Sequence, residues 1–237
     1  MNIAIILSGG NGIRMGVDVP KQYLEVEGHP VIWYSLKTFS ICSEIDAFVI
    51  GCSCDWLGFV KEQVDKLQIH QPVFYSLPGE TRQFSIFNAL KVVNERGFSE
   101  NDLVIIHDAA RPLVSQEIIR RCLYGCRGAD GTLPVISVKD TIYQSTDGKT
   151  IVSLLNRNEL YAGQAPEAFV YGKYFHLHET MSHDELLKIN GSTEIAYKGG
   201  LNVKLVKGDE MNFKITTPED LSNFESIIKN RQMHESV

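Results

Sequence analysis

Short runs of apolar residues alternate with longer mixed segments along the first two thirds of the chain. The apolar runs are rich in β-branched and aromatic residues, as strands are, whereas the mixed segments repeat their apolar positions at the helical spacing. The pattern predicts strands at residues 3–7, 46–53, 72–76, 102–107 and 132–138. It predicts helices over residues 31–41, 57–67, 81–96 and 115–126. Such alternation indicates an α/β fold with a mostly parallel sheet and helices on both faces.

The segment 138–155 breaks this alternation. Two β-prone runs surround Asp147 and Gly148, and an Asp-Gly pair between strand-like runs is a strong hairpin signal. A hairpin inserted late in an α/β chain does not easily join the parallel sheet, so we expect a protruding β-arm at about 138–155. Arms of this kind commonly pack on a partner subunit. Because no repeat or linker-like change in composition is present, we treat residues 1–237 as a single domain.

The last helix has the clearest start in the chain. Thr217 offers a capping hydroxyl, Pro218 suits the first helical position, and Glu219 and Asp220 face the positive end of the helix. We expect this helix to run to about Lys229.

Composition narrows the class of partner. The 237 residues are 43% hydrophobic and 22% charged, which is ordinary for a globular protein, and the net charge is 23 − 29 = −6. This sign disfavours a nucleic acid or an anionic membrane surface as partner. No apolar run approaches the roughly 18–20 residues of a membrane span. An odd number of cysteines, five, without an export signal predicts reduced thiols and a cytoplasmic location.

The strongest local motif follows the first strand, where three glycines stand at positions 9, 10 and 12. Glycines at the carboxyl end of a buried strand let backbone N–H groups approach an anion closely. The loop is not a P-loop, since no Gly-Lys-Ser/Thr follows at the required spacing, and Met15 replaces the third glycine of a dinucleotide fingerprint. Arg14 and Lys21 add two cations, which favours phosphate binding over a plain glycine-rich turn.

Two further segments carry candidate chemistry. Asp108 ends the strand at 102–107 and is a suitable ligand for Mg²⁺, with Arg111 close by for a second anion; the alternative is a capping aspartate with a structural arginine. The segment Gly79–Ser85 begins a helix with groups that can hydrogen-bond a base or a phosphate, but taken alone it is more typical of an ordinary capped helix. Arg157 and Lys214 are two further candidate cations, although without these motifs each would be interpreted as an ordinary solvated side chain.

Together the motifs resemble those of the CTP-dependent cytidylyltransferases that act on sugar-alcohol phosphates. The resemblance spans the chain from Ile5 to Asp220 and includes Pro-Lys-Gln at 20–22, His-Asp-Ala-Ala-Arg-Pro at 107–112 and Asn-x-Lys-x-Thr at 212–216. It implies a Rossmann-like fold with a protruding β-arm that builds a homodimer. It also implies CTP and a polyol phosphate as substrates.

The resemblance implies roles position by position. The residues that would bind CTP are Leu7, Ser8, Gly9, Gly10, Asn11, Gly12, Gly79, Arg82, Ser85 and Asp108. Asp108 would also hold Mg²⁺, with Glu210 or its neighbour Asp209 as a second acidic ligand. The residues that would bind the acceptor are Arg111, Thr141, Arg157 and Lys214, with Arg157 reaching over from the partner's arm. The catalytic cations would be Arg14, Lys21, Arg157 and Lys214.

The implied reaction is nucleotidyl transfer, in which an acceptor phosphate oxygen attacks the α-phosphorus of CTP and pyrophosphate leaves. No protein nucleophile is needed, so the site must bring two anions together and stabilise charge on the α-phosphate. Other classes considered are a dinucleotide-dependent oxidoreductase, disfavoured by Met15, and a non-catalytic nucleotide-binding module.

Departures from the family pattern bear on the acceptor. The first loop begins Leu-Ser-Gly-Gly at 7–10, closer to the D-ribitol 5-phosphate branch, and Asn-Gly-Ser-Thr-Glu at 190–194 replaces the erythritol-type Thr-Asp-Asp/Glu-Ala-Ser. Ala109 and Ala110 are instead typical of the 2-C-methyl-D-erythritol 4-phosphate branch. We favour D-ribitol 5-phosphate as acceptor, with 2-C-methyl-D-erythritol 4-phosphate as the alternative.

Overall fold

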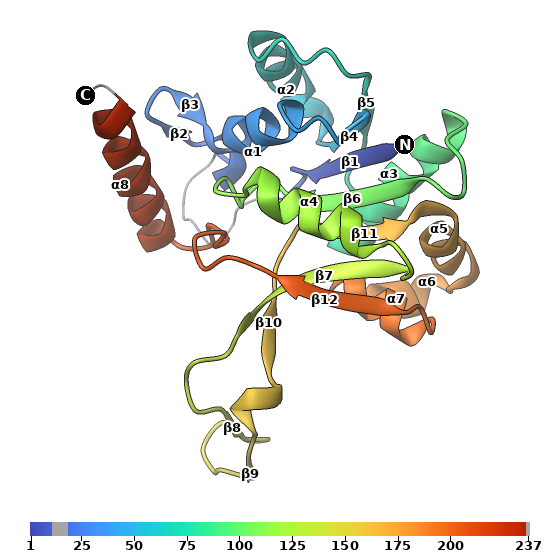
Figure 1. Cartoon of the computed structure of the whole chain (residues 1–237), viewed down its shortest axis with the longest axis vertical. Helices are drawn as coiled ribbons and strands as arrows, with labels where there is room; N and C mark the ends of the chain where they lie inside the picture. The colour runs from blue at the N-terminus through green and yellow to red at the C-terminus, as the bar shows by residue number, and fades with distance from the viewer. Residues whose placement is uncertain (11–18, 236–237) are drawn as a thin grey trace.

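The computed structural model describes residues 1–10 and 19–235. These residues form an eight-stranded sheet in the order β10-β7-β11-β6-β1-β4-β5, with β12 alongside β7 (Figure 1). The strands are β1 Asn2–Leu7, β4 Ala47–Gly51, β5 Val73–Ser76, β6 Leu103–Asp108, β7 Gly131–Ser137, β10 Tyr161–Gly163, β11 Glu167–Val170 and β12 Val203–Lys207. The strands β6, β1, β4 and β5 are parallel, whereas β11 runs antiparallel between β6 and β7. The expected α/β fold with a mostly parallel sheet is confirmed.

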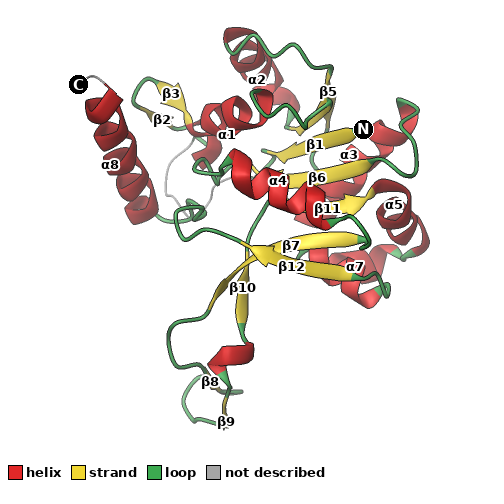
Figure 2. Cartoon of the chain, viewed as in Figure 1, coloured by secondary structure: helices red, strands yellow, loops and turns green. Residues whose placement is uncertain are grey.

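The central strands are apolar along their length because both faces of the sheet are covered. Alternate residues of β1 enter different apolar clusters, with Ala4 and Ile6 on one face and Ile3 and Ile5 on the other. The first face packs against α1 Val31–Ser40, α2 Cys54–Lys66 and α4 Gln116–Gly125. The second packs against α3 Arg82–Glu95, α5 Tyr171–Thr180, α6 His183–Leu187 and α7 Ser192–Lys198 (Figure 2).

The C-terminal helix α8, Pro218–Glu235, is longer than the sequence pattern predicts. Its predicted start is confirmed, since the Asp220 N–H donates to the Thr217 hydroxyl at 3.3 Å. Phe224 and Ile228 pack with Val26 of the small hairpin formed by β2 Glu25–Val26 and β3 His29–Pro30. This packing fixes the end of the segment that carries Lys214.

The hairpin predicted around Asp147 and Gly148 is present. It consists of β8 Tyr143–Gln144 and β9 Ser153–Leu154, which form a separate antiparallel two-stranded sheet. The Asp147 carboxylate accepts hydrogen bonds from the N–H groups of Lys149 and Thr150, each at 2.8 Å, and Gly148 takes a φ of 68°. In Figure 1 this part of the chain extends away from the main sheet. Apolar side chains on it are more than half exposed: Tyr143, Ile151, Val152 and Leu154.

Within the described residues, no helix combines the length and the apolar character that crossing a membrane requires.

Candidate active site

Asp108 occupies the centre of the candidate site, at the carboxyl end of β6 and in register with Leu7 at the end of β1. Its carboxylate is only 9% exposed and is held by two cations. Oδ1 accepts from Arg82 Nε at 2.9 Å, and Oδ2 accepts from Lys214 Nζ at 2.8 Å. Burial alone would raise the pKa of Asp108, but the charges of Arg82 and Lys214 outweigh it and hold the pKa far below its usual value. Asp108 is therefore an anion that joins residues from three distant parts of the sequence.

Arg82 is set in place from both its backbone and its side chain. It is the first residue of α3, whose N-cap Thr81 accepts a hydrogen bond from the Phe84 N–H. Its Nη1 donates to the hydroxyl of Ser192, the first residue of α7. The backbone carbonyl of Ser192 in turn accepts from the Tyr174 hydroxyl at 3.1 Å. The sequence motifs identify Arg82, but they give no sign of the buried Ser192.

Glu167 is a second site carboxylate that sequence reasoning misses. In the ladder between β11 and β6 it lies opposite Ile106, two residues from Asp108 and thus on the same face of the sheet. Burial raises its pKa, while the charge of Arg82 opposes that rise. One carboxylate oxygen, Oε2, has no hydrogen-bond partner among the described residues. A lone glutamate outside any motif carries no sequence signal, and only the strand pairing reveals its position.

The segment carrying Lys214 is held against the sheet by side chains that donate hydrogen bonds to backbone carbonyls. Arg111 Nη1 donates to the Asn212 carbonyl at 2.7 Å, and Asn212 Nδ2 donates to the Ala165 carbonyl at 2.7 Å. Gln164 Nε2 donates to the Asp209 carbonyl at 2.8 Å. These contacts place the expected acceptor residues Arg111 and Lys214 on the same side of the site as Asp108.

Two glycine-containing loops meet beside this cluster. A Cβ on Gly9 would lie 2.4 Å from the Pro78 Cβ, so the loop after β1 approaches the loop after β5 too closely for a side chain. A Cβ on Gly79 would lie 2.3 Å from the Phe84 Cβ, and the Gly79 N–H donates to Ser85 Oγ at 2.9 Å. The structure thus brings together the loops expected to bind CTP, and it uses Ser85 to hold the turn.

Among the residues that the structure describes, Thr141, Arg157 and Glu210 are not joined to this cluster in one chain. Thr141 is exposed on the arm and Arg157 is exposed directly after it, where Arg157 Nη1 donates to the Lys139 carbonyl at 3.0 Å. Glu210, the expected second metal ligand, forms an exposed ion pair with Lys139. Lys21 begins a one-turn 3₁₀ helix, Lys21–Tyr23. Asn11, Gly12 and Arg14 lie outside the described residues.

Asp108 fits a divalent cation as a single protein ligand. Mg²⁺ is usually held by one or two carboxylates together with substrate phosphates and water, so a full protein cage is not required. Across the described parts of the chain, no group of three or more His, Cys, Asp or Glu side chains is placed to hold a metal ion. Each Asp108 oxygen accepts one hydrogen bond from a cation, and an ionised carboxylate oxygen has a second lone pair that can face a metal ion.

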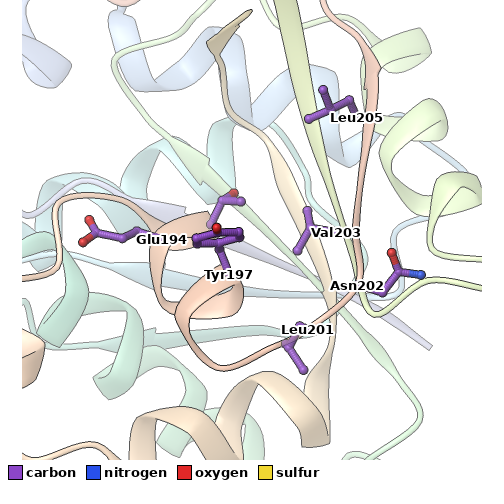
Figure 3. A pocket seen from close by; sticks show the side chains of 7 residues that line it. Glu194, Tyr197, Leu201, Asn202, Val203 and Leu205 are labelled. Carbon is purple, nitrogen blue, oxygen red and sulfur yellow. The ribbon is translucent and has the colours of Figure 1, made fainter. Parts of the chain in front are cut away.

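A separate surface hollow of about 530 Å³ lies between α7 and β12 (Figure 3). Its lining residues are Thr193, Glu194, Tyr197, Leu201, Asn202, Val203 and Leu205. The charged member of this set, Glu194, is paired with Lys198 at 2.7 Å. Because none of the seven lining side chains is a cation, the hollow does not suit a phosphate.

Comparison with known proteins shows the family of this chain. The family model described as "IspD: 2-C-methyl-D-erythritol 4-phosphate cytidylyltransferase" matches residues 2–230. The enzyme of that name from Clostridium novyi (strain NT) is 32% identical over 230 residues, covering 97% of both chains. Its counterpart from Clostridium perfringens (strain SM101 / Type A) is 33% identical over 227 residues, covering 96% of this chain and 98% of the relative. The crystal structure of 4-diphosphocytidyl-2C-methyl-D-erythritol synthase from Anaerococcus prevotii DSM 20548 superimposes with a TM-score of 0.81 at 25% identity, covering 96% of each chain.

These matches change the order of the two acceptors. The family model and both clostridial relatives are named for 2-C-methyl-D-erythritol 4-phosphate, so the alternative has more support than the D-ribitol 5-phosphate favoured from the sequence departures. The matches also argue against a dinucleotide-dependent oxidoreductase, because each of them is a cytidylyltransferase. The resemblance drawn from the motifs is confirmed: the chain belongs to the IspD cytidylyltransferase family and is a CTP-dependent nucleotidyltransferase.

Proposed function

We propose that this enzyme transfers the cytidylyl group of CTP to 2-C-methyl-D-erythritol 4-phosphate and releases pyrophosphate. The family match over residues 2–230 supports the acceptor. The structural observation that carries the chemistry is the buried Asp108 carboxylate held between Arg82 and Lys214. This cluster concentrates positive charge beside two glycine-containing loops in a protein whose net charge is −6.

The reaction makes one bond and breaks one bond at the α-phosphorus. An oxygen of the acceptor phosphate attacks that phosphorus, and the bond to the bridging oxygen of the β-phosphate breaks as pyrophosphate leaves with the electron pair. The acceptor is already an anion, so no protein base has to remove a proton. Arg82, Lys214 and Arg111 would hold the two anions close together and stabilise the charge that spreads over the α-phosphate.

Asp108 is the residue that would hold Mg²⁺, and this role remains part of the proposal. The cation, when bound, would neutralise phosphate charge and polarise the α-phosphate. Because Asp108 is already ionised, it can bind a metal ion without losing a proton. Glu210 stays a prediction as second ligand, with Lys139 competing for its carboxylate.

The acceptor site would be completed by the arm of a second copy of the chain. Thr141 belongs to the arm, Arg157 follows it directly, and both are exposed in the isolated chain. The arm also exposes Tyr143 at 56% and Leu154 at 64%, paired across its two strands. Apolar side chains this exposed are costly in water, and burial against a partner would remove that cost. We therefore propose a homodimer in which each arm serves the neighbouring site.

The function is tested by identifying the product. Purified enzyme is incubated with Mg²⁺, 2-C-methyl-D-erythritol 4-phosphate and each of CTP, ATP, GTP and UTP, and both pyrophosphate and the nucleotide product are measured. We expect equal amounts of pyrophosphate and the cytidylylated product with CTP, and far less with the other nucleotides. Turnover with CTP in the absence of any polyol phosphate, or no product with this acceptor, would contradict the proposal.

A further inference from the structure

A buried side-chain amide lies against the glycine loop that follows β1. Gln22 is 3% exposed, and its Nε2 donates to the Ser8 carbonyl at 2.6 Å and to the Gly10 carbonyl at 2.8 Å. A carboxamide nitrogen carries two hydrogens, so this geometry uses both of them on the same loop. The loop is thus held at two points by one side chain from the next segment of the chain.

The neighbouring Tyr23 adds a third contact and anchors the turn. Its hydroxyl lies 3.0 Å from the Ser8 carbonyl and donates to it, and burial raises the pKa of Tyr23 to about 12, so the hydroxyl keeps its proton. The Tyr23 ring stacks on Trp56 of α2 at 4.4 Å between ring centroids. The turn that holds the loop is therefore fixed to the helical layer of the fold.

These contacts decide which way the loop's peptide groups point. In a trans peptide the carbonyl of one residue and the N–H of the next point in opposite directions. Because the Ser8 carbonyl is turned toward Gln22 and Tyr23, the Gly9 N–H points away from them. The N–H groups of Gly9 and Gly10 donate to no residue that the structure describes, whereas the Ser8 N–H donates to the Gly51 carbonyl at 2.8 Å.

The two glycines have different surroundings. Gly9 is packed against Pro78, whereas a Cβ on Gly10 would meet no described atom within 4 Å outside its chain neighbours. Gly10 is also exposed. The loop is consequently braced on the side of Gln22 and accessible at Gly10, which is the arrangement an anion needs to approach backbone N–H groups.

We propose that Gln22 is a positioning residue for the triphosphate of CTP. By holding the Ser8 carbonyl inward, it keeps the Gly9 N–H directed away from Gln22 before the nucleotide arrives, and its second bond, to the Gly10 carbonyl, holds the next part of the loop. This inference rests on the proposed function, because it takes CTP as the ligand of the loop. Gln22 itself does not touch the nucleotide. Its effect is preorganisation, so its loss should weaken nucleotide binding before it affects the acceptor.

The test compares two substitutions with a matched control. Gln22→Glu keeps the shape but turns a carboxylate toward two carbonyls, and Gln22→Met removes both donors without adding charge. Gln71→Glu is the control, since Gln71 Nε2 also donates to a backbone carbonyl, that of Ser40 at 2.9 Å, away from the candidate site. Each protein is checked by circular dichroism, CTP affinity is measured by calorimetry in the presence of Mg²⁺, and KM is measured for both substrates.

We expect Gln22→Met to raise the dissociation constant and the KM for CTP about tenfold or more, with Gln22→Glu worse, while the acceptor KM changes less than about threefold. Gln71→Glu should leave both KM values near those of the parent. If folded Gln22→Met bound CTP as the parent does, or if both KM values rose equally, the positioning role would be wrong. If the parent bound CTP but transferred nothing to the acceptor, the proposed function would fail while the binding comparison still decided the role of Gln22.

Discussion

At the scale of single residues, the site depends on an ionised carboxylate that is buried between cations. Arg82 and Lys214 each donate a hydrogen bond to one oxygen of Asp108, and the Ser192 hydroxyl accepts a further hydrogen bond from Arg82. A buried charge is tolerated only when it is paired and hydrogen-bonded, so removal of one member leaves the others poorly compensated. We therefore expect Asp108, Arg82 and Lys214 to affect both local stability and the binding of phosphate.

Asp108→Asn should make the stability less dependent on pH. The pKa of Asp108 is lowered in the folded state, so its contribution to stability is present above the unfolded value of about 3.9 and is lost as the pH falls through the folded value. We expect urea unfolding to show the variant clearly less stable than the parent at pH 7, and the difference to shrink at pH 3. A difference of the same size at both pH values would contradict an ionised, ion-paired Asp108.

Ser192→Ala tests the support behind Arg82. The lost hydrogen bond involves a charged donor, and bonds of that kind contribute about 1.5–3 kcal/mol. We expect the free energy of unfolding to fall by about that amount. We also expect a lower kcat, because Arg82 is no longer held toward Asp108. Ser226→Ala is the control, since the exposed Ser226 hydroxyl donates only to the Ser222 carbonyl within its own helix. Equal effects of the two substitutions on kcat would rule out a role for Ser192 in the site.

At the scale of secondary-structure elements, the sequence pattern predicts the buried strands well and the later, shorter strands poorly. The strands β1, β4 and β6 are continuous apolar runs because helices cover both faces, and this pattern is visible in the sequence. The four-residue strand β11 lacks that length, and β12, Val-Lys-Leu-Val-Lys, mixes two lysines with apolar residues without strict alternation. The motifs identify Arg82, Asp108 and Lys214, but they do not show that one carboxylate joins all three, since the joining contacts span 26 and 106 residues.

The cap of α3 should matter for catalysis as well as for stability. Thr81 accepts from the Phe84 N–H at 3.4 Å and precedes Arg82 directly, so the cap fixes the start of the helix that carries the arginine. Thr81→Ala should cost about 1 kcal/mol of unfolding free energy and also reduce kcat. Ser115→Ala, which removes the equivalent cap of α4 at 3.3 Å from the Ile118 N–H, should cost a similar free energy with kinetics unchanged. Thermal unfolding and steady-state kinetics of both variants provide the comparison.

At the scale of the whole molecule, the proposed dimer makes each active site a shared one. Arg157 begins a short 3₁₀ helix, Arg157–Glu159, directly after the arm, whereas Asp108 lies at the carboxyl end of β6 in the interior of the main sheet. If Arg157 acts on the partner's site, a mixed dimer of Arg157→Ala and Asp108→Asn subunits contains one intact site and one doubly altered site. Random exchange of two inactive variants should then restore about a quarter of the parent activity, because half of the dimers are mixed and each has one working site. No recovery after verified subunit exchange would place Arg157 in its own subunit's site or outside the reaction.

Apolar side chains on the arm provide a separate test of the dimer. Replacing Ile151 and Leu154, both 64% exposed, with serine should give monomers in light scattering while the main sheet stays folded. Leu205→Ser is the control, since Leu205 is 54% exposed on β12, outside the arm. A dimer that survives the arm substitutions, or a monomer produced by the control, would contradict assembly through the arm.

We propose that this site joins the cytidylyl group of CTP to 2-C-methyl-D-erythritol 4-phosphate. This proposal is tested most directly by the ratio of kcat/KM for that acceptor to kcat/KM for D-ribitol 5-phosphate, measured with the same enzyme, CTP and Mg²⁺. Discrimination by buried polar contacts commonly exceeds a hundredfold, so we expect the methylerythritol substrate to be favoured by about that factor or more. A ratio near one, or one that favours D-ribitol 5-phosphate, would contradict the account.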